Sequence, residues 1–177
     1  PKPPEISRTI AIDWLERTPE VIVQYLQQRL KDGGCAAVIC NTVARSQQIY
    51  QTVKEAAIVP SEDCILFHAR FPFAWRKEIE DRVLARLKRD GNRPEKAIVI
   101  ATQVIEQSLD LDFDLMISDL APVDLLIQRA GRMHRHTRPS RPSRLSTPVL
   151  AICCPEQSAD CSPDFGPDGF VYSPYYL

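Results

Sequence analysis

Short apolar runs alternate with amphipathic segments along most of this chain. The runs contain no acidic residue, lysine or arginine, and they span residues 35–40, 64–68, 97–101, 115–118 and 148–153. Continuous apolar runs of this length are typical of strands that are covered on both faces, as in a parallel sheet. We therefore predict a buried strand at each of these ranges.

The segments between the runs predict helices. Thr18, Pro19 and Glu20 form a helix start, because a hydroxyl caps the first turn, proline suits its first position and an acid faces the positive end of the dipole. Gly33 and Gly34 end that helix. The spacing of apolar residues predicts further helices at 43–57, 73–89 and 123–132.

Strands that alternate with helices indicate an α/β fold, a parallel sheet with helices on both faces and right-handed crossovers. We place this sheet domain at residues 17–153. Residues 1–16 are expected to be a linker or lead-in, because the chain opens on proline-rich sequence without a methionine, and we read it as part of a longer protein. Residues 154–177 are expected to be a tail or a linker to a missing C-terminal region.

Composition limits the kinds of partner. With 177 residues, 44% of them hydrophobic, the chain can bury one full core. A formal net charge of -1 argues against binding nucleic acid through global charge, so a polyanion site must be local. No apolar run approaches the ~20 residues of a membrane helix, and no signal peptide is present. Six cysteines form no CxxC pair, and we expect a cytoplasmic protein without a metal site or a membrane partner.

The strongest local charge lies between residues 129 and 144, which contain six arginines, two histidines and no acidic residue. Arg129, Arg132 and Arg135 are spaced by three, so on a helix they would fall within a ~120° arc and span about 9 Å. Such a row suits a triphosphate, and Gly131 leaves room for a close partner. The alternative is a solvated basic helix end.

The order of residues in two segments resembles that of superfamily 2 helicases. The segments are A-T-Q-V-I-E-Q-S-L-D-L-D-F-D at 101–114 and Q-R-A-G-R-M-H-R-H at 128–136. Together they resemble the CRISPR-associated helicase–nuclease of type I systems, and 40–43 and 68–71 are similar to weaker motifs of that family. The resemblance, over about 19–153, implies a RecA-like sheet of the P-loop NTPase fold, the second motor domain without its own P-loop.

The resemblance implies roles in ATP hydrolysis. Arg132 and Arg135 match arginines that reach the γ-phosphate, and Gln128 matches a polar residue near that phosphate and the attacking water. Arg129 matches a supporting neighbour, and Asp110 matches an acid that contacts the ribose. We therefore expect Gln128, Arg132 and Arg135 to be catalytic, and Asp110, Arg129 and Gly131 to contact the nucleotide.

The resemblance also implies contacts with nucleic acid at Thr42, Thr102, Arg70 and Arg76. Hydroxyls at a helix start and at a strand end suit phosphate oxygens. Thr42 is equally well interpreted as a helix cap, and Thr102 as a plain strand-end residue. Trp75 stands where the family pattern has an acidic residue, which weakens the match of this motif.

Two motifs of a complete ATPase are absent from the sequence, G-x-x-x-x-G-K-[ST] and D-E-x-[HD]. We therefore expect the chain to hydrolyse no ATP alone. ATP and Mg²⁺ are expected as cofactors, held mainly by a missing first motor domain. The expected partners are single-stranded DNA, the first RecA-like domain and the nuclease domain of the parent chain, and a CRISPR surveillance complex. The alternatives are an RNA helicase half and a non-enzymatic nucleic-acid-binding module.

One acidic pattern in the first of these segments has a simpler interpretation. Asp110, Asp112 and Asp114 resemble a calcium loop, but Leu115 and Ala121 replace the required glycine and glutamate, so calcium is rejected.

The arginines beyond the second motif, at 138, 141 and 144, are separated from it by prolines and cannot continue its helix. They are expected in a solvated loop, with a nucleic-acid contact as the alternative.

Overall fold

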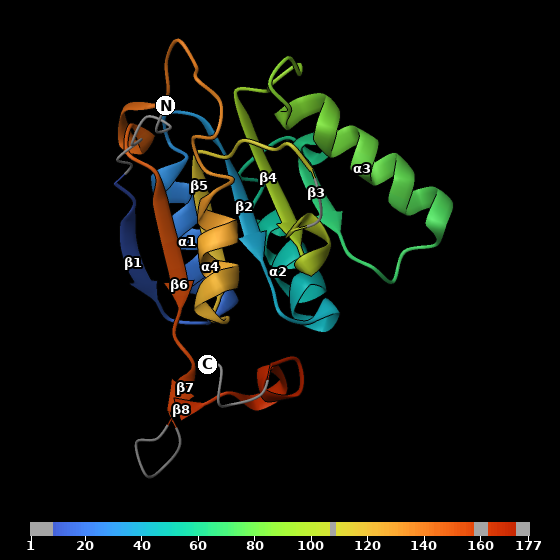
Figure 1. Ribbon diagram of the computed structural model, residues 1–177, viewed down its shortest axis with the longest axis vertical. Coiled ribbons are helices and arrows are strands. Elements are labelled where there is room, and N and C mark those ends of the chain that lie inside the picture. Colours follow the sequence, from blue (N-terminus) through green and yellow to red (C-terminus); the bar gives the residue numbers. More distant parts are fainter. Residues whose placement is uncertain (1–8, 107–108, 158–162, 173–177) are drawn as a thin grey trace, which may run out of the picture.

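One parallel sheet organises the molecule. The computed structural model describes residues 9–106, 109–157 and 163–172. The sheet has six strands in the order β1-β6-β5-β2-β4-β3 (Figure 1). Its strands are β1 (Ala11–Leu15), β2 (Gly34–Ile39), β3 (Cys64–Phe67), β4 (Lys96–Ala101), β5 (Leu115–Asp119) and β6 (Val149–Cys153). The predicted RecA-like α/β fold is confirmed.

Helices connect the strands. The α-helices are α1 (Pro19–Arg29), α2 (Val43–Glu55), α3 (Phe73–Leu87) and α4 (Val123–Ala130). Short 3₁₀ turns are η1 (Ser61–Asp63), η2 (Gln103–Glu106), η3 (Ser143–Leu145) and η4 (Gly166–Phe170). An antiparallel pair, β7 (Glu156–Gln157) and β8 (Pro163–Asp164), follows the sheet. No helix in the described ranges has both the length and the apolar character needed to cross a membrane.

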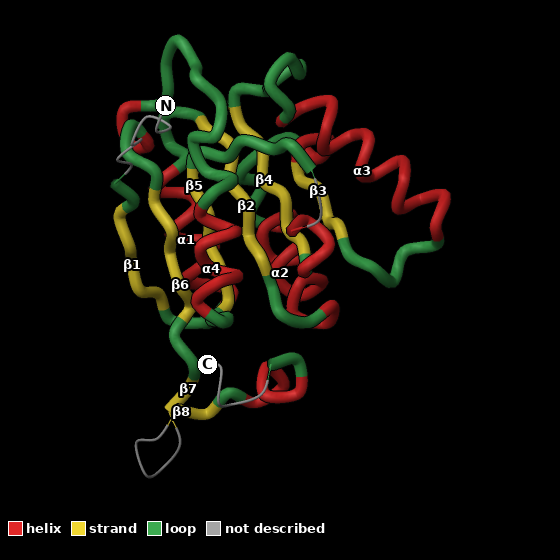
Figure 2. The backbone as a smooth tube through the Cα atoms, viewed as in Figure 1, coloured by secondary structure: helices red, strands yellow, loops and turns green. Residues whose placement is uncertain are grey.

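The helices cover both faces of the sheet (Figures 1 and 2). Ile22 of α1 and Ile49 of α2 pack in one core, whereas Leu87 of α3 and Ala130 of α4 pack in the other. Each central strand contributes alternate side chains to the two cores, which is why its sequence is apolar throughout.

The direction of each crossover decides which face it covers. The connections β1 to β2 and β2 to β3 run toward the β3 edge, and those from β3 to β4, β4 to β5 and β5 to β6 run toward the β1 edge. Right-handed crossovers place connections of opposite direction on opposite faces. The loop between β4 and β5 therefore shares a face with α4, and Ile105, Leu111 and Phe113 pack in the same core as Ala130.

Strand β1 lies within the segment expected to be a lead-in. It pairs in parallel with β6 and forms an edge of the sheet, so the sheet extends beyond the expected boundary at residue 17. The pattern of this strand is hard to recognise, because Ile12 and Trp14 are 48% and 62% exposed and no apolar run marks it. Residues 1–8 lie outside the described residues.

Helix α4 ends earlier than expected, at Ala130 rather than at residue 132. Beyond it the backbone pairs with the β4–β5 loop: Phe113 N–H donates to Arg132 O, and His134 N–H donates to Phe113 O, both at 2.9 Å. His134, four residues beyond the helix, has a φ of 47°, in the left-handed region. The prediction that three arginines form a row on one helix is therefore wrong.

Candidate functional site

The pairing of Phe113 with Met133 brings the β4–β5 loop against the turn that follows α4. Asp110 from the loop and Arg135 from the turn meet there, with Arg135 Nε 2.9 Å from Asp110 Oδ1. Both side chains are about half exposed, at 47% for Arg135 and 55% for Asp110. This pair is the exposed part of the predicted nucleotide site.

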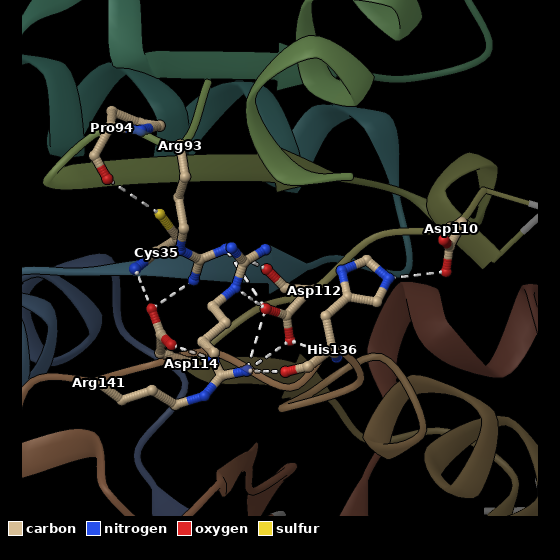
Figure 3. Close-up of polar contacts among 9 residues, drawn as sticks. Cys35, Arg93, Pro94, Asp110, Asp112, Asp114, His136 and Arg141 are labelled. Atoms are coloured by element: carbon tan, nitrogen blue, oxygen red, sulfur yellow. Dashed lines mark hydrogen bonds and ion pairs between the residues drawn. The ribbon is translucent and has the colours of Figure 1, made fainter. Parts of the chain in front are cut away.

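A buried histidine holds the same carboxylate. His136 Nε2 lies 3.0 Å from Asp110 Oδ1, and the His136 side chain is only 2% exposed (Figure 3). The hydrogen bond from His136, together with the positive charge of Arg135, lowers the pKa of the Asp110 carboxyl. Asp110 is therefore ionised at neutral pH, ready to accept from two donors.

The other two arginines of the motif point inward. Arg129 is fully buried, and its guanidinium lies 2.6 Å from Glu106 Oε1 and donates to Ser118 Oγ at 2.7 Å. Arg132 is 8% exposed and donates to the carbonyl oxygens of Leu109 and, at 2.7 Å, Glu106. Arg129 therefore ties α4 to the β4–β5 loop and Arg132 ties the turn after α4 to it, and within this motif Arg135 is the arginine at the surface.

Gln128 and Gly131 lie on the exposed side of the same segment. A Cβ added to Gly131 would meet Gln128 O at 3.3 Å and Ile127 O at 3.5 Å, and no side chain. Gly131 is thus an exposed position whose added Cβ would be limited by backbone carbonyls of its own segment.

Thr42 and Thr102 are brought together at the carboxyl edge of the sheet. Their strands, β2 and β4, are neighbours, and Gln103 Nε2 donates to Asn41 O at 3.2 Å across the two strand ends. Thr42 caps α2, its Oγ1 accepting from Arg45 N at 3.3 Å, as its alternative interpretation expects. Thr102 is only 4% exposed.

Arg70 and Arg76 follow β3 at the same edge. Arg70 is exposed, and the Arg76 guanidinium lies over the Phe73 ring, 5.6 Å from its centre. A cavity of about 290 Å³ adjoins Arg76, lined by Phe67, Ala69, Phe73, Arg76, Lys77, Glu80 and Val104. Val104 is two residues beyond Thr102, so this cavity links Arg76 to the strand end that carries Thr102.

A buried ion cluster occupies the start of β5, formed by Arg93, Asp112, Asp114, Arg138 and Arg141 (Figure 3). The expectation of a solvated loop at Arg138 and Arg141 is wrong, because the two aspartates require buried cations. Burial raises the pKa of Asp112, but hydrogen bonds from Arg138 and Arg141 outweigh it, and the pKa lies below its usual value.

Arg144, in contrast, is 44% exposed and pairs with Asp32 at 3.0 Å, as a loop residue in solvent should.

No group of three or more histidine, cysteine, aspartate or glutamate side chains in the described ranges is placed to hold a metal ion. Cys35 and Cys153 are buried, and burial raises the pKa of each thiol to about 12. They are protonated at neutral pH and act as small apolar side chains. Cys161 lies outside the described residues.

The structure adds functional residues that the sequence pattern does not mark. His136 holds Asp110, and its place within the second motif was the only signal for it. Gln103 and Tyr172 bridge the carboxyl edge to Arg129, and nothing in the pattern around Tyr172 marks it. Gln107 and Ser108 of the first motif lie outside the described residues.

Comparisons with known proteins identify the family of this chain. The model of the family described as CRISPR-associated nuclease/helicase Cas3, C-terminal, matches residues 32–138. The CRISPR-associated endonuclease/helicase Cas3 of Thermus thermophilus is 38% identical over 206 residues, covering 92% of this chain and 22% of that protein.

Solved structures are similar over nearly the whole chain. The crystal structure of T. fusca Cas3-ATP gives a TM-score of 0.85 at 36% identity, covering 97% of this chain and 20% of that one. A chain of a CRISPR RNA-guided surveillance complex, pre-nicking, gives a TM-score of 0.78 at 34% identity, covering 94% and 21%. The chain thus spans about a fifth of the length of these relatives.

Proposed function

This chain belongs to the family of Cas3 C-terminal helicase domains, and we propose that it is the second motor domain of an ATP-dependent translocase on single-stranded DNA. The parent protein acts in CRISPR interference. The chain supplies an arginine finger and half of the DNA track. It does not hydrolyse ATP alone, because its sequence has no P-loop to cradle the phosphates.

The observation that carries this proposal is the half-exposed Arg135 resting on Asp110. Charge placed on the γ-phosphate is the largest protein contribution to phosphoryl transfer. A guanidinium that is exposed and held by one carboxylate can exchange that partner for a phosphate presented by another domain. Arg132 is the second finger candidate, and it reaches the phosphate only if the carbonyls of Glu106 and Leu109 release it.

Neighbouring residues complete the nucleotide side. Asp110 contacts the ribose once Arg135 has moved, and Gln128, on the exposed side of α4, orients the attacking water. Gly131 lets the first motor domain approach closely. Arg129 supports them from the interior, because its ion pair with Glu106 holds the β4–β5 loop against α4.

Thr42, Thr102, Arg70 and Arg76 form the DNA track at the carboxyl edge of the sheet. Arg70 and Arg76 bring positive charge to phosphates, and Thr42 lies at the start of a helix, where backbone N–H groups attract anions. Thr102 is buried, so its contact requires a strand to enter close to the end of β4.

The remaining parts of the reaction belong to the parent. ATP and Mg²⁺ are held mainly by the first RecA-like domain, and a nuclease domain degrades the DNA. The surveillance complex recruits the parent, as the similarity to a chain of such a complex suggests. The cytoplasm is the expected location.

The test is the DNA-stimulated ATPase of the full-length parent with Arg135→Ala. We expect turnover to fall about 10³-fold, because the finger is lost. Arg144→Ala is the matched control, since Arg144 is similarly exposed and pairs with Asp32 at 3.0 Å, and it should retain full turnover. Equal activity of the two variants would contradict the proposal. Stronger stimulation by RNA than by DNA would favour an RNA helicase instead.

A further inference from the structure

His136 connects the buried ion cluster to the surface. Its backbone N–H donates to Asp112 Oδ1 at 3.4 Å, and its carbonyl accepts from Arg141 Nη2 at 2.9 Å (Figure 3). Asp112 is fully buried and Arg141 is nearly so. The backbone of His136 is therefore hydrogen-bonded on both sides to the buried cluster, and the position of its imidazole is set by the interior of the domain.

The ring of His136 points at the carboxylate on which Arg135 rests. An ionised carboxylate only accepts hydrogen bonds, so Nε2 of His136 carries the proton and donates to Asp110 Oδ1. Arg135 Nε binds the same oxygen at 2.9 Å, against 3.0 Å for His136. One oxygen atom thus joins a buried donor, which stays in place, to an exposed donor, which is able to leave.

We propose that His136 is a positioning residue that holds Asp110, so that Asp110 keeps Arg135 beside the cleft between turnovers. This inference rests on the proposed function. An ion pair as exposed as Arg135–Asp110 is weak, and a phosphate of higher charge displaces the carboxylate. The hydrogen bond from buried His136 remains, so Asp110 stays in position when Arg135 leaves and receives it again after hydrolysis.

Two substitutions in the full-length parent separate positioning from packing. His136→Phe keeps an aromatic ring without a donor, and His136→Gln keeps a donor that reaches about as far as Nε2. We expect DNA-stimulated kcat to fall about 10- to 100-fold with Phe, because Arg135 is misplaced, and to recover most of that loss with Gln. If packing alone mattered, Phe would equal or exceed Gln, which would overturn the proposal.

A double-variant cycle tests whether His136 acts through Asp110. In an Asp110→Ala background, adding His136→Phe should cause no further loss of kcat, whereas independent roles would give additive losses and overturn the proposal. Thermal unfolding of each variant checks that it is folded. If His136→Phe unfolds, His136→Asn replaces it, since its amide is too short to reach Asp110.

The outcome for Arg135 distinguishes this inference from the proposed function. If Arg135→Ala lowers kcat and His136→Phe does not, only the role of His136 is refuted. If Arg135→Ala leaves kcat unchanged, the proposed function itself is refuted.

Discussion

The phenol oxygen of Tyr172 lies 3.2 Å from Nη2 of Arg129, which is fully buried in the helicase motif. Gln103, directly after Thr102, donates to the same phenol oxygen at 3.2 Å. Asp168 of the same segment pairs with Arg17 at 2.7 Å. The described part of the expected tail is thus fastened to the carboxyl edge of the sheet.

Replacing Tyr172 with phenylalanine should therefore destabilise the domain. The change removes an acceptor shared by two donors, and we expect the free energy of unfolding to fall by about 1 kcal/mol in urea titrations. Tyr50→Phe is the control. The Tyr50 ring contacts Lys54, but the described residues provide no hydrogen bond to the Tyr50 hydroxyl. An unchanged midpoint for Tyr172→Phe would show that the segment is not fastened in solution.

Arg129→Met should be more damaging. Glu106 is 11% exposed and would lose its buried cation, which costs about 3–5 kcal/mol of the free energy of unfolding. Replacing both residues, as Arg129→Met with Glu106→Leu, should recover part of the loss, because no unpaired charge remains. Urea unfolding of the single and double variants measures the difference. If Arg129→Met were as stable as the original chain, the ion pair between Arg129 and Glu106 would not stabilise the fold.

Stability should decline in acid through Asp112. The pKa of Asp112 in the folded chain lies below its value in the unfolded chain, which is about 3.9. The stabilisation that Asp112 provides is therefore complete above about pH 5 and is lost as the pH falls through the folded pKa. Urea midpoints should drop between about pH 5 and pH 2. Asp112→Asn should be less stable at pH 7, because its arginines lose a charge, and should show a flatter acid dependence. An equally steep dependence would assign the acid sensitivity to other carboxyls.

Gly131→Ala tests the approach of another domain. Its φ is -62°, and the nearest atom to an added Cβ is Gln128 O at 3.3 Å, so we expect the stability of this chain to change by less than about 0.5 kcal/mol. ATPase of the full-length parent should nevertheless fall if the first motor domain approaches Gly131 as we propose, since the added methyl group would stand between them. Unchanged ATPase would mean that no domain comes close to Gly131.

Gly34→Ala is the contrasting variant. Gly34 has a φ of 116°, and an added Cβ would lie 2.6 Å from Leu145 Cδ1. We expect a loss of about 1–3 kcal/mol, measured by the same urea titration, from backbone strain and overpacking.

The local pattern predicted most elements well. Short apolar runs mark strands β2 to β6 and helical spacing of apolar residues marks α1 to α4, so residues close in sequence carry the signal. Strand β1 escaped prediction, because an edge strand with exposed Ile12 and Trp14 has no continuous apolar run. The end of α4 was misplaced, because pairing with Phe113 stops the helix, and that partner is distant in sequence.

Residue order and short-range spacing were sufficient to establish the α/β class, the family resemblance and the set of candidate residues. Which arginine is exposed follows from the folded chain alone. Crossover direction puts the β4–β5 loop on the face of α4, and there Glu106 draws Arg129 inward while Asp110 keeps Arg135 at the surface. Equal spacing along the chain cannot distinguish these arginines, since burial and pairing depend on partners that folding brings near.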